Sequence, residues 1–214
     1  MERYKYMGHN LVELARTELS DDFIMNFCLG LPDVYKNSYD YAYGYFGPAQ
    51  AKDLLPHIRR AKTEEHLEKT ASGFGNLNTD TCLNTAKNCR HVWLLSETIV
   101  LTANAVTGPR EMVRPAIFRD TLAESNQLDI FPDPNKKHLG TACYSMILHG
   151  PQELEPTRVG FVCLVFPSSD SKSYLYRCNL LELLEIKLYP SLAEEKIHDN
   201  SFPELKKNIS IQEG

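Results

Sequence analysis

Residues 159–166 place the strongest constraint on how this chain can fold. They read VGFVCLVF, with apolar side chains at both odd and even positions. Because side chains alternate between the two faces of a strand, such a segment has to be covered on both sides. We therefore expect an inner strand of a sheet, with helices packed against at least one face.

Four further segments have the composition of strands, rich in β-branched and aromatic residues and bounded by turn-forming residues. They are residues 91–95, 98–106, 141–149 and 173–178, of which the first two could also form one long bent strand. The links between the later segments are short, Gly150-Pro151 and residues 167–170, and short links favour antiparallel pairing.

Helices are predicted before the strands. Residues 10–28 carry an apolar stripe at three- or four-residue spacing. The alternative is a second helix that starts at residues 20–22 (Ser-Asp-Asp), which cap better than they propagate. Gly30 and Pro32 are expected to end the helix in either case. Residues 49–69 predict another helix, which Pro56 would kink or divide.

The combined prediction is an α+β fold. N-terminal helices pack on a mostly antiparallel sheet of about four or five strands, with a helix inserted after the second strand, near residues 115–127, and a C-terminal helix at 180–188. The length fits a single domain over residues 1–190, with a helical part at 1–75 and a sheet part at 90–190. Residues 70–89 are expected to be mostly loop, and 191–214 a peripheral polar tail.

The overall charge and the N-terminal residues limit the partners. The net charge is −5, so the molecule as a whole does not match nucleic acid. The N-terminal residues MERYKY lack the apolar core of a secretory signal, and the longest apolar runs fall far short of the ~20 residues that span a bilayer. We expect a soluble, cytoplasmic protein with no membrane partner, and the oligomeric state stays open.

The cysteines and glycines point to no cofactor. Six cysteines in a chain without an export signal are expected to be reduced thiols. Cys82 and Cys89 lie too far apart for a zinc motif, so no metal site is expected. The Gly73-Phe74-Gly75 run lacks the third glycine and the preceding strand of the dinucleotide fingerprint.

A run of tyrosines is the most distinctive local feature. Tyr39, Tyr41, Tyr43 and Tyr45 alternate with other residues, and we expect this segment to be extended rather than helical. The four rings would then project from one face and form a stacking surface for a ligand or a protein partner. The alternative, which the frequency of half-buried tyrosines favours, is that the rings cover the helices and expose only their hydroxyls.

The densest group of arginines is Arg110, Arg114 and Arg119, around the predicted helix start near residue 115. Together they could hold a phosphate or a carboxylate. Arg114 and Arg119 are five residues apart, however, so on a helix they would not share a face. The more ordinary alternative is that these arginines pair with neighbouring carboxylates.

Catalytic patterns are weak. His149 and Ser145 share a strand face but would lie ~13 Å apart, too far for a nucleophile and its base. Asp133 and the Glu185-Ile186-Lys187 triplet have the wrong context for a nuclease, because two strands intervene. The sequence therefore favours a non-enzymatic binding or interaction protein that uses the tyrosines and the arginines, with a protein or an anionic ligand as partner. The alternative is a metal-dependent nuclease or other hydrolase whose site is assembled from scattered residues, so whether the chain is an enzyme stays open.

Overall fold

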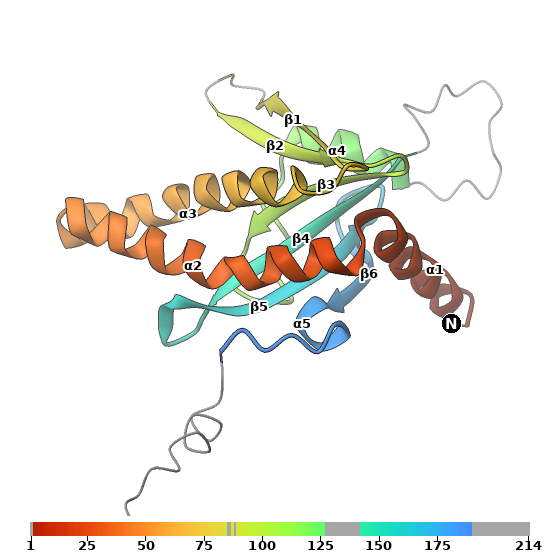
Figure 1. The fold of residues 1–214 in the computed structure, drawn as a ribbon. Coiled ribbons are helices and arrows are strands. Elements are labelled where there is room, and N and C mark those ends of the chain that lie inside the picture. Colours follow the sequence, from red (N-terminus) through yellow and green to blue (C-terminus); the bar gives the residue numbers. More distant parts are fainter. Residues whose placement is uncertain (1, 85–86, 88, 127–141, 190–214) are drawn as a thin grey trace, which may run out of the picture.

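The computed structural model describes residues 2–84, 87, 89–126 and 142–189, with side chains from residue 11 onward. Helices come first, a sheet follows, and a short helix comes last (Figure 1), which confirms the predicted α+β class. The sheet has six strands rather than four or five. The predicted tail at 191–214 lies outside the described residues.

The first two helices meet at a capping residue. α1 spans Glu2–Leu19 and α2 spans Asp21–Tyr45. Ser20 lies between them with φ 61°, and its Oγ accepts a hydrogen bond from the backbone N of Phe23. A serine at this position satisfies an N–H that has no partner within the helix. The alternative of a second helix starting at residues 20–22 is thus confirmed.

α2 continues through Gly30 and Pro32, so the prediction that these residues end the helix is wrong. The helix tolerates them because packing outweighs the local cost of an interior proline, which is ~3 kcal/mol. α3 (Pro48–Ala71) crosses α2 closely: a Cβ on Gly30 would lie 2.2 Å from Cε1 of His66. Nε2 of His66 also lies 2.9 Å from the carbonyl O of Phe27, within hydrogen-bonding distance. Pro56 lies inside α3 without ending it.

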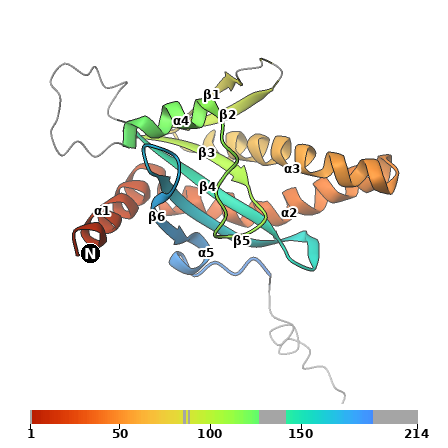
Figure 2. The same cartoon turned by 180° about the vertical axis from the view of Figure 1, so that it is seen from behind.

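The tyrosine run is therefore helical, and the expectation of an extended segment is wrong. All four tyrosines lie in the last two turns of α2. Tyrosines at every second position are also tyrosines four residues apart, and residues four apart are neighbours on a helix surface. On α2, residues 39 and 43 form one such pair and residues 41 and 45 the other. In both ribbon views (Figures 1 and 2) the joined end of α2 and α3 projects past the sheet.

The strands form one sheet in the order β1-β2-β3-β4-β5-β6. Their bounds are β1 Asn78–Leu83, β2 Arg90–Leu95, β3 Ile99–Ala105, β4 Cys143–Gln152, β5 Glu155–Pro167 and β6 Tyr174–Asn179. All neighbours are antiparallel except β3 and β4, which are parallel. β1 falls where a loop was predicted, because the first four of its residues, NTDT, are polar and it pairs only with β2 at the edge of the sheet.

The parallel pair requires the chain to return along the sheet between β3 and β4. The described part of this connection contains α4 (Ile117–Ala123) and the 3₁₀ helix η1 (Glu124–Asn126), within the predicted helix at 115–127. The last helix, α5 (Leu180–Leu183), is shorter than the predicted 180–188. It stops because Glu185 has φ 52°, a left-handed conformation that an α-helix does not continue.

Each face of the sheet has its own core. α2 and α3 cover one face (Figure 1), where Phe27, Leu31 and Leu67 pack against Leu101 and Leu164 of the sheet. The described part of the connection between β3 and β4, residues 106–126, lies over the other face (Figure 2), above a second apolar cluster. That cluster contains Tyr144, Met146, Leu148, Cys163 and Val165. β5 contributes to both cores, which confirms the inner strand predicted at 159–166.

The described helices include none that is long and apolar enough to cross a membrane. All six cysteines are free thiols.

Candidate functional site

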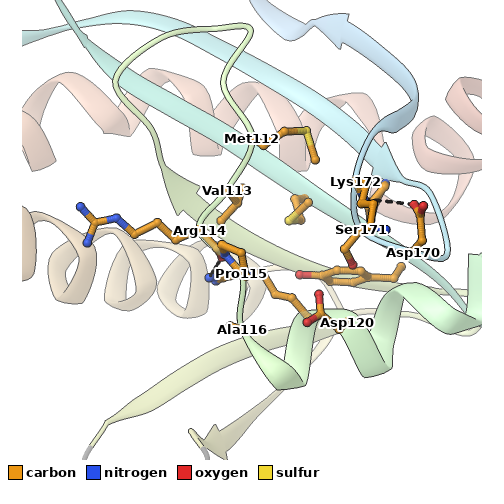
Figure 3. Close-up of a pocket in the computed structure, with 13 residues that line it drawn as sticks. Met112, Val113, Arg114, Pro115, Ala116, Asp120, Asp170, Ser171 and Lys172 are labelled. Atoms are coloured by element: carbon orange, nitrogen blue, oxygen red, sulfur yellow. Dashed lines mark hydrogen bonds between the residues drawn. The ribbon is translucent and has the colours of Figure 1, made fainter.

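A cavity of about 230 Å³ lies on the sheet face opposite α2 and α3. Figure 3 shows its walls, which come from the chain before α4, from the first turn of α4, from β4 and from the loop between β5 and β6. Met112, Val113 and Met146 provide apolar surface, and Arg119, Asp120 and Lys172 provide charges. Segments far apart in the sequence thus meet at one amphipathic cavity.

The chain before α4, residues 107–116, has no regular secondary structure and is held by β6. The hydroxyl of Tyr174 accepts a hydrogen bond from the backbone N of Val113 at 3.3 Å and donates one to the carbonyl O of Glu111 at 3.1 Å. Arg177 donates to the carbonyl O of Pro109. Tyr174 and Arg177 of β6 thus hold this wall of the cavity in place, although residues 107–116 are not paired with a strand of the sheet.

Arg119 is the most constrained charge at the cavity. Its Nη1 donates to Oδ1 of Asn104 at 2.9 Å, and its Nη2 donates to the carbonyl O of Arg114 at 2.6 Å. The guanidinium also lies 4.9 Å from the ring centroid of Phe118. Burial lowers the pKa of Arg119, but an arginine keeps its charge in proteins. Within the described part of the chain, no carboxylate forms an ion pair with this side chain.

A row of hydrogen bonds beneath the cavity links β3 to β4. Nδ2 of Asn104 donates to Oγ1 of Thr102 at 2.9 Å, and Oγ1 of Thr102 shares a hydrogen bond of 2.9 Å with the hydroxyl of Tyr144. Burial raises the pKa of Tyr144 to about 12. The phenol therefore keeps its proton at neutral pH. The row of hydrogen bonds runs from Arg119 through Asn104 and Thr102 to Tyr144 and forms a polar surface beneath the cavity.

Asn126 in η1 ties the end of the connection to the sheet. Its Nδ2 donates to the carbonyl O of Tyr144 at 2.8 Å and to that of Pro167 at 2.9 Å, while its Oδ1 accepts from the backbone N of Tyr144 at 2.8 Å. One buried amide thus satisfies three backbone groups. Tyr144 and Pro167 both line the cavity, so Asn126 holds two of its walls in place.

The loop between β5 and β6 closes the remaining side. Oδ1 of Asp170 accepts hydrogen bonds from Oγ of Ser168 at 2.6 Å and from the backbone N of Lys172 at 3.1 Å. Ser171 has φ 56°, and its Oγ is buried without a hydrogen-bond partner in the described structure. Figure 3 shows Asp170, Ser171 and Lys172 on the opposite side of the cavity from Arg114 and Pro115. The hydroxyl of Ser171 is therefore an unused polar group at the wall.

The side chains of the three arginines that the sequence grouped do not meet at the cavity. Arg110 is exposed and does not line the cavity. Arg114 lines it, but Figure 3 shows its side chain pointing away, so its contribution is the carbonyl O that accepts from Arg119. Arg119 alone turns its charge toward the sheet. Sequence reasoning missed Thr102 and Asn104, whose signal was two polar residues at alternate positions in a strand that is otherwise apolar.

The tyrosines lie on α2, which covers the sheet face opposite the cavity. Tyr39 and Tyr43 stack with ring centroids 4.3 Å apart, and Tyr41 and Tyr45 lie 4.9 Å apart. Tyr41 is 47% exposed and Tyr45 76% exposed, whereas Tyr39 packs against a small apolar cluster at the α2–α3 end. The four rings thus lie in two pairs, and Tyr41, Tyr43 and Tyr45 are exposed.

A second polar cluster lies within the helix-side core. The hydroxyl of Tyr35 lies 2.7 Å from Nδ1 of His149, within hydrogen-bonding distance, and the guanidinium of Arg59 lies 4.1 Å from the Tyr35 ring centroid. Nη2 of Arg59 donates to the carbonyl O of Pro156 at 2.7 Å, while its Nε is buried without a partner in the described structure. His149 thus pairs with Tyr35 rather than with a serine nucleophile.

The described residues contain no group of three or more His, Cys, Asp and Glu side chains placed to hold a metal ion. Comparisons of the chain with protein-family models, with curated proteins and with solved structures find no match. The function is therefore argued from the chemistry of the site.

Proposed function

We propose that this chain is a non-enzymatic binding protein whose cavity takes a small ligand, with Arg119 binding an anionic group of that ligand. The supporting observation is the state of Arg119, a partly buried guanidinium that lies at the cavity and has no carboxylate partner in the described structure. A buried charge is costly unless it is paired. Arginine has five N–H donors, and protein groups occupy two of them here.

The size and the walls of the cavity support a small, partly apolar ligand. Its volume of about 230 Å³ exceeds the ~150 Å³ of a protein cavity that admits benzene. Met112 and Met146 provide adaptable apolar surface. A molecule with one ring or a short aliphatic chain, and one anionic group, fits these dimensions.

Binding is favoured over catalysis by the state of Tyr144 and Arg119, two largely buried polar groups at the cavity. Tyr144 has a pKa of about 12, so at neutral pH it is a hydrogen-bonding group rather than a base. Arg119 cannot exchange a proton either. The alternative of a metal-dependent hydrolase draws no support from the described carboxylates, histidines and cysteines.

The experiment measures binding of valerate, benzoate and inorganic phosphate by ligand-observed NMR. We expect a carboxylate to bind the native protein, and Arg119→Gln to weaken that binding about tenfold or more, as loss of a charged hydrogen bond requires. Arg110→Gln, which removes an exposed arginine outside the cavity, is the matched control. Arg119→Lys keeps the charge and tests whether the forked geometry matters. Equal binding by Arg119→Gln and the native protein would overturn the proposal.

The tyrosines support a second role as a surface for a protein partner. Tyr41 and Tyr45, together with Phe46 at 39% exposure, present rings to solvent at the projecting end of α2. Exposed aromatic residues are over-represented at protein interfaces. A protein partner that binds the native chain should no longer bind a Tyr41→Ser/Tyr45→Ser variant. The same partner should still bind a Glu65→Ser variant, which is the control.

The proposal includes a cytoplasmic location, which the six free thiols support.

A further inference from the structure

The charges at the cavity divide into two pairs. Asp170 and Lys172 belong to the loop between β5 and β6, where hydrogen bonds from Ser168 and Lys172 and the charge of Lys172 lower the pKa of Asp170. Arg119 and Asp120 are neighbours in α4, and both line the cavity. The carboxylate of Asp170 accepts its hydrogen bonds within its own loop, so Asp120 is the acidic group at the cavity that is left for a ligand, opposite the charge of Arg119.

The carboxylate of Asp120 lies close to the groups that surround the cavity. Its charge raises the pKa of Arg119, against the larger effect of burial, and adds to the rise that burial causes in the pKa of Tyr144. Figure 3 shows Asp120 at the lower rim of the cavity. Asp120 nevertheless forms neither a salt bridge nor a side-chain hydrogen bond in the described structure. A positive and a negative group thus border one space without forming a direct ion pair.

We propose that the ligand is a zwitterion, an α-amino acid with a short apolar side chain; this inference rests on the proposed function. The carboxylate of the amino acid pairs with Arg119, and its ammonium group pairs with Asp120. The side chain lies against Met112 and Met146. A simple anion bound at Arg119 would also lie near the carboxylate of Asp120, and like charges at close range repel. An ammonium group on the same molecule removes that penalty and adds a charged hydrogen bond.

The experiment compares three probes with the same five-carbon chain: L-norvaline, which carries both charges, valerate, which is only an anion, and pentylamine, which is only a cation. Affinities are measured by calorimetry on the native chain. We expect norvaline to bind about tenfold or more tightly than valerate, and pentylamine to bind most weakly. In Asp120→Asn, norvaline and valerate should bind with similar affinity. Glu124→Gln, an exposed acid that does not line the cavity, should leave the preference unchanged.

The outcomes separate this inference from the proposed function. If valerate binds the native chain through Arg119 at least as tightly as norvaline does, the zwitterion inference is overturned while the anion site stands. If Asp120→Asn keeps the full preference for norvaline, the role of Asp120 is overturned. If none of the probes binds the native chain, both proposals fail. Thermal unfolding of Asp120→Asn serves as the folding check, because Asp120 is exposed and its loss should not affect stability.

Discussion

The hydroxyl of Tyr35 in α2 lies 2.7 Å from Nδ1 of His149 in β4, a contact between residues 114 apart in the sequence. Both side chains are fully buried, so the bond joins the helical layer to the sheet where water cannot replace either partner. Nδ1 of His91 in β2 and Oε1 of Glu64 in α3, 3.0 Å apart, form another side-chain link between these two layers.

Tyr35→Phe should destabilise the fold by about 1–3 kcal/mol, because it leaves a buried ring nitrogen of His149 without a partner. Chemical denaturation measures the change in the free energy of unfolding. Tyr43→Phe removes the same hydroxyl from an exposed ring and should have no measurable effect. Equal results for the two variants would show that the buried bond adds nothing to stability.

His149 should make stability depend on pH. Burial lowers its pKa from 6.5 to about 3, so between these values the unfolded chain binds a proton that the folded chain does not. Stability therefore falls as the pH falls through this range, by up to about 1.4 kcal/mol per pH unit. The native chain should be more stable than His149→Gln at pH 7.5, and the difference should narrow by about 2 kcal/mol at pH 5. A difference that stays constant would contradict the assignment.

Val165→Asp should abolish folding. Val165 is fully buried on the cavity-side face of β5, and an unpaired carboxylate there costs more than ~4 kcal/mol. Leu154→Asp places the same charge at a side chain that is 89% exposed and should melt like the native chain. Circular dichroism of the two purified variants provides the comparison, and a folded Val165→Asp protein would refute an inner position for β5.

Replacing Tyr41 and Tyr45 by Ser should change the free energy of unfolding by less than ~1 kcal/mol, since exposed rings contribute little to folding. Phe27→Ala, at a fully buried position of the same helix, should cost ~3–5 kcal/mol. The melting temperatures of the two variants distinguish these cases. A steep fall for the tyrosine variant would mean that the pair covers the core and is not free to bind a partner.

The features that sequence predicted well are those in which the local pattern and the tertiary role agree. Residues 159–166 are apolar at every second position on both faces, and β5 is covered on both faces. Ser20 caps better than it propagates a helix, and it separates α1 from α2. In such places the residues of one segment are enough to predict its structure.

Other features depend on contacts that a local pattern does not contain. Gly30 and Pro32 weaken a helix locally, yet α2 passes through them because α3 packs on its backbone at His66. The polar residues of β1 take an extended form because β2 offers an edge to pair with. Tertiary packing outweighed propensity in both cases.

The candidate site was the least predictable part. The arginine group contained Arg119, and the five-residue spacing indicated that Arg114 and Arg119 would not share a helix face, but nothing in the sequence showed which of the two would turn toward the sheet. Tyr144 and Asn104 belong to strands whose parallel pairing depends on a connection of more than thirty residues between β3 and β4. A cavity whose walls come from three distant segments has no signature in any one of them.

The parallel pairing of β3 and β4 has a consequence for how this protein can evolve. The connection that the pairing requires returns over the face opposite α2 and α3, and the same connection carries Met112, Arg119 and Asp120. Substitutions there can alter ligand preference without touching the helix-side core, in which Phe27, Leu67 and Leu164 are buried. Selection for binding can therefore act on a few residues of the connection, Met112, Arg119 and Asp120, while the helix-side core and the buried strand residues of the cavity-side cluster, such as Val165, are kept for stability.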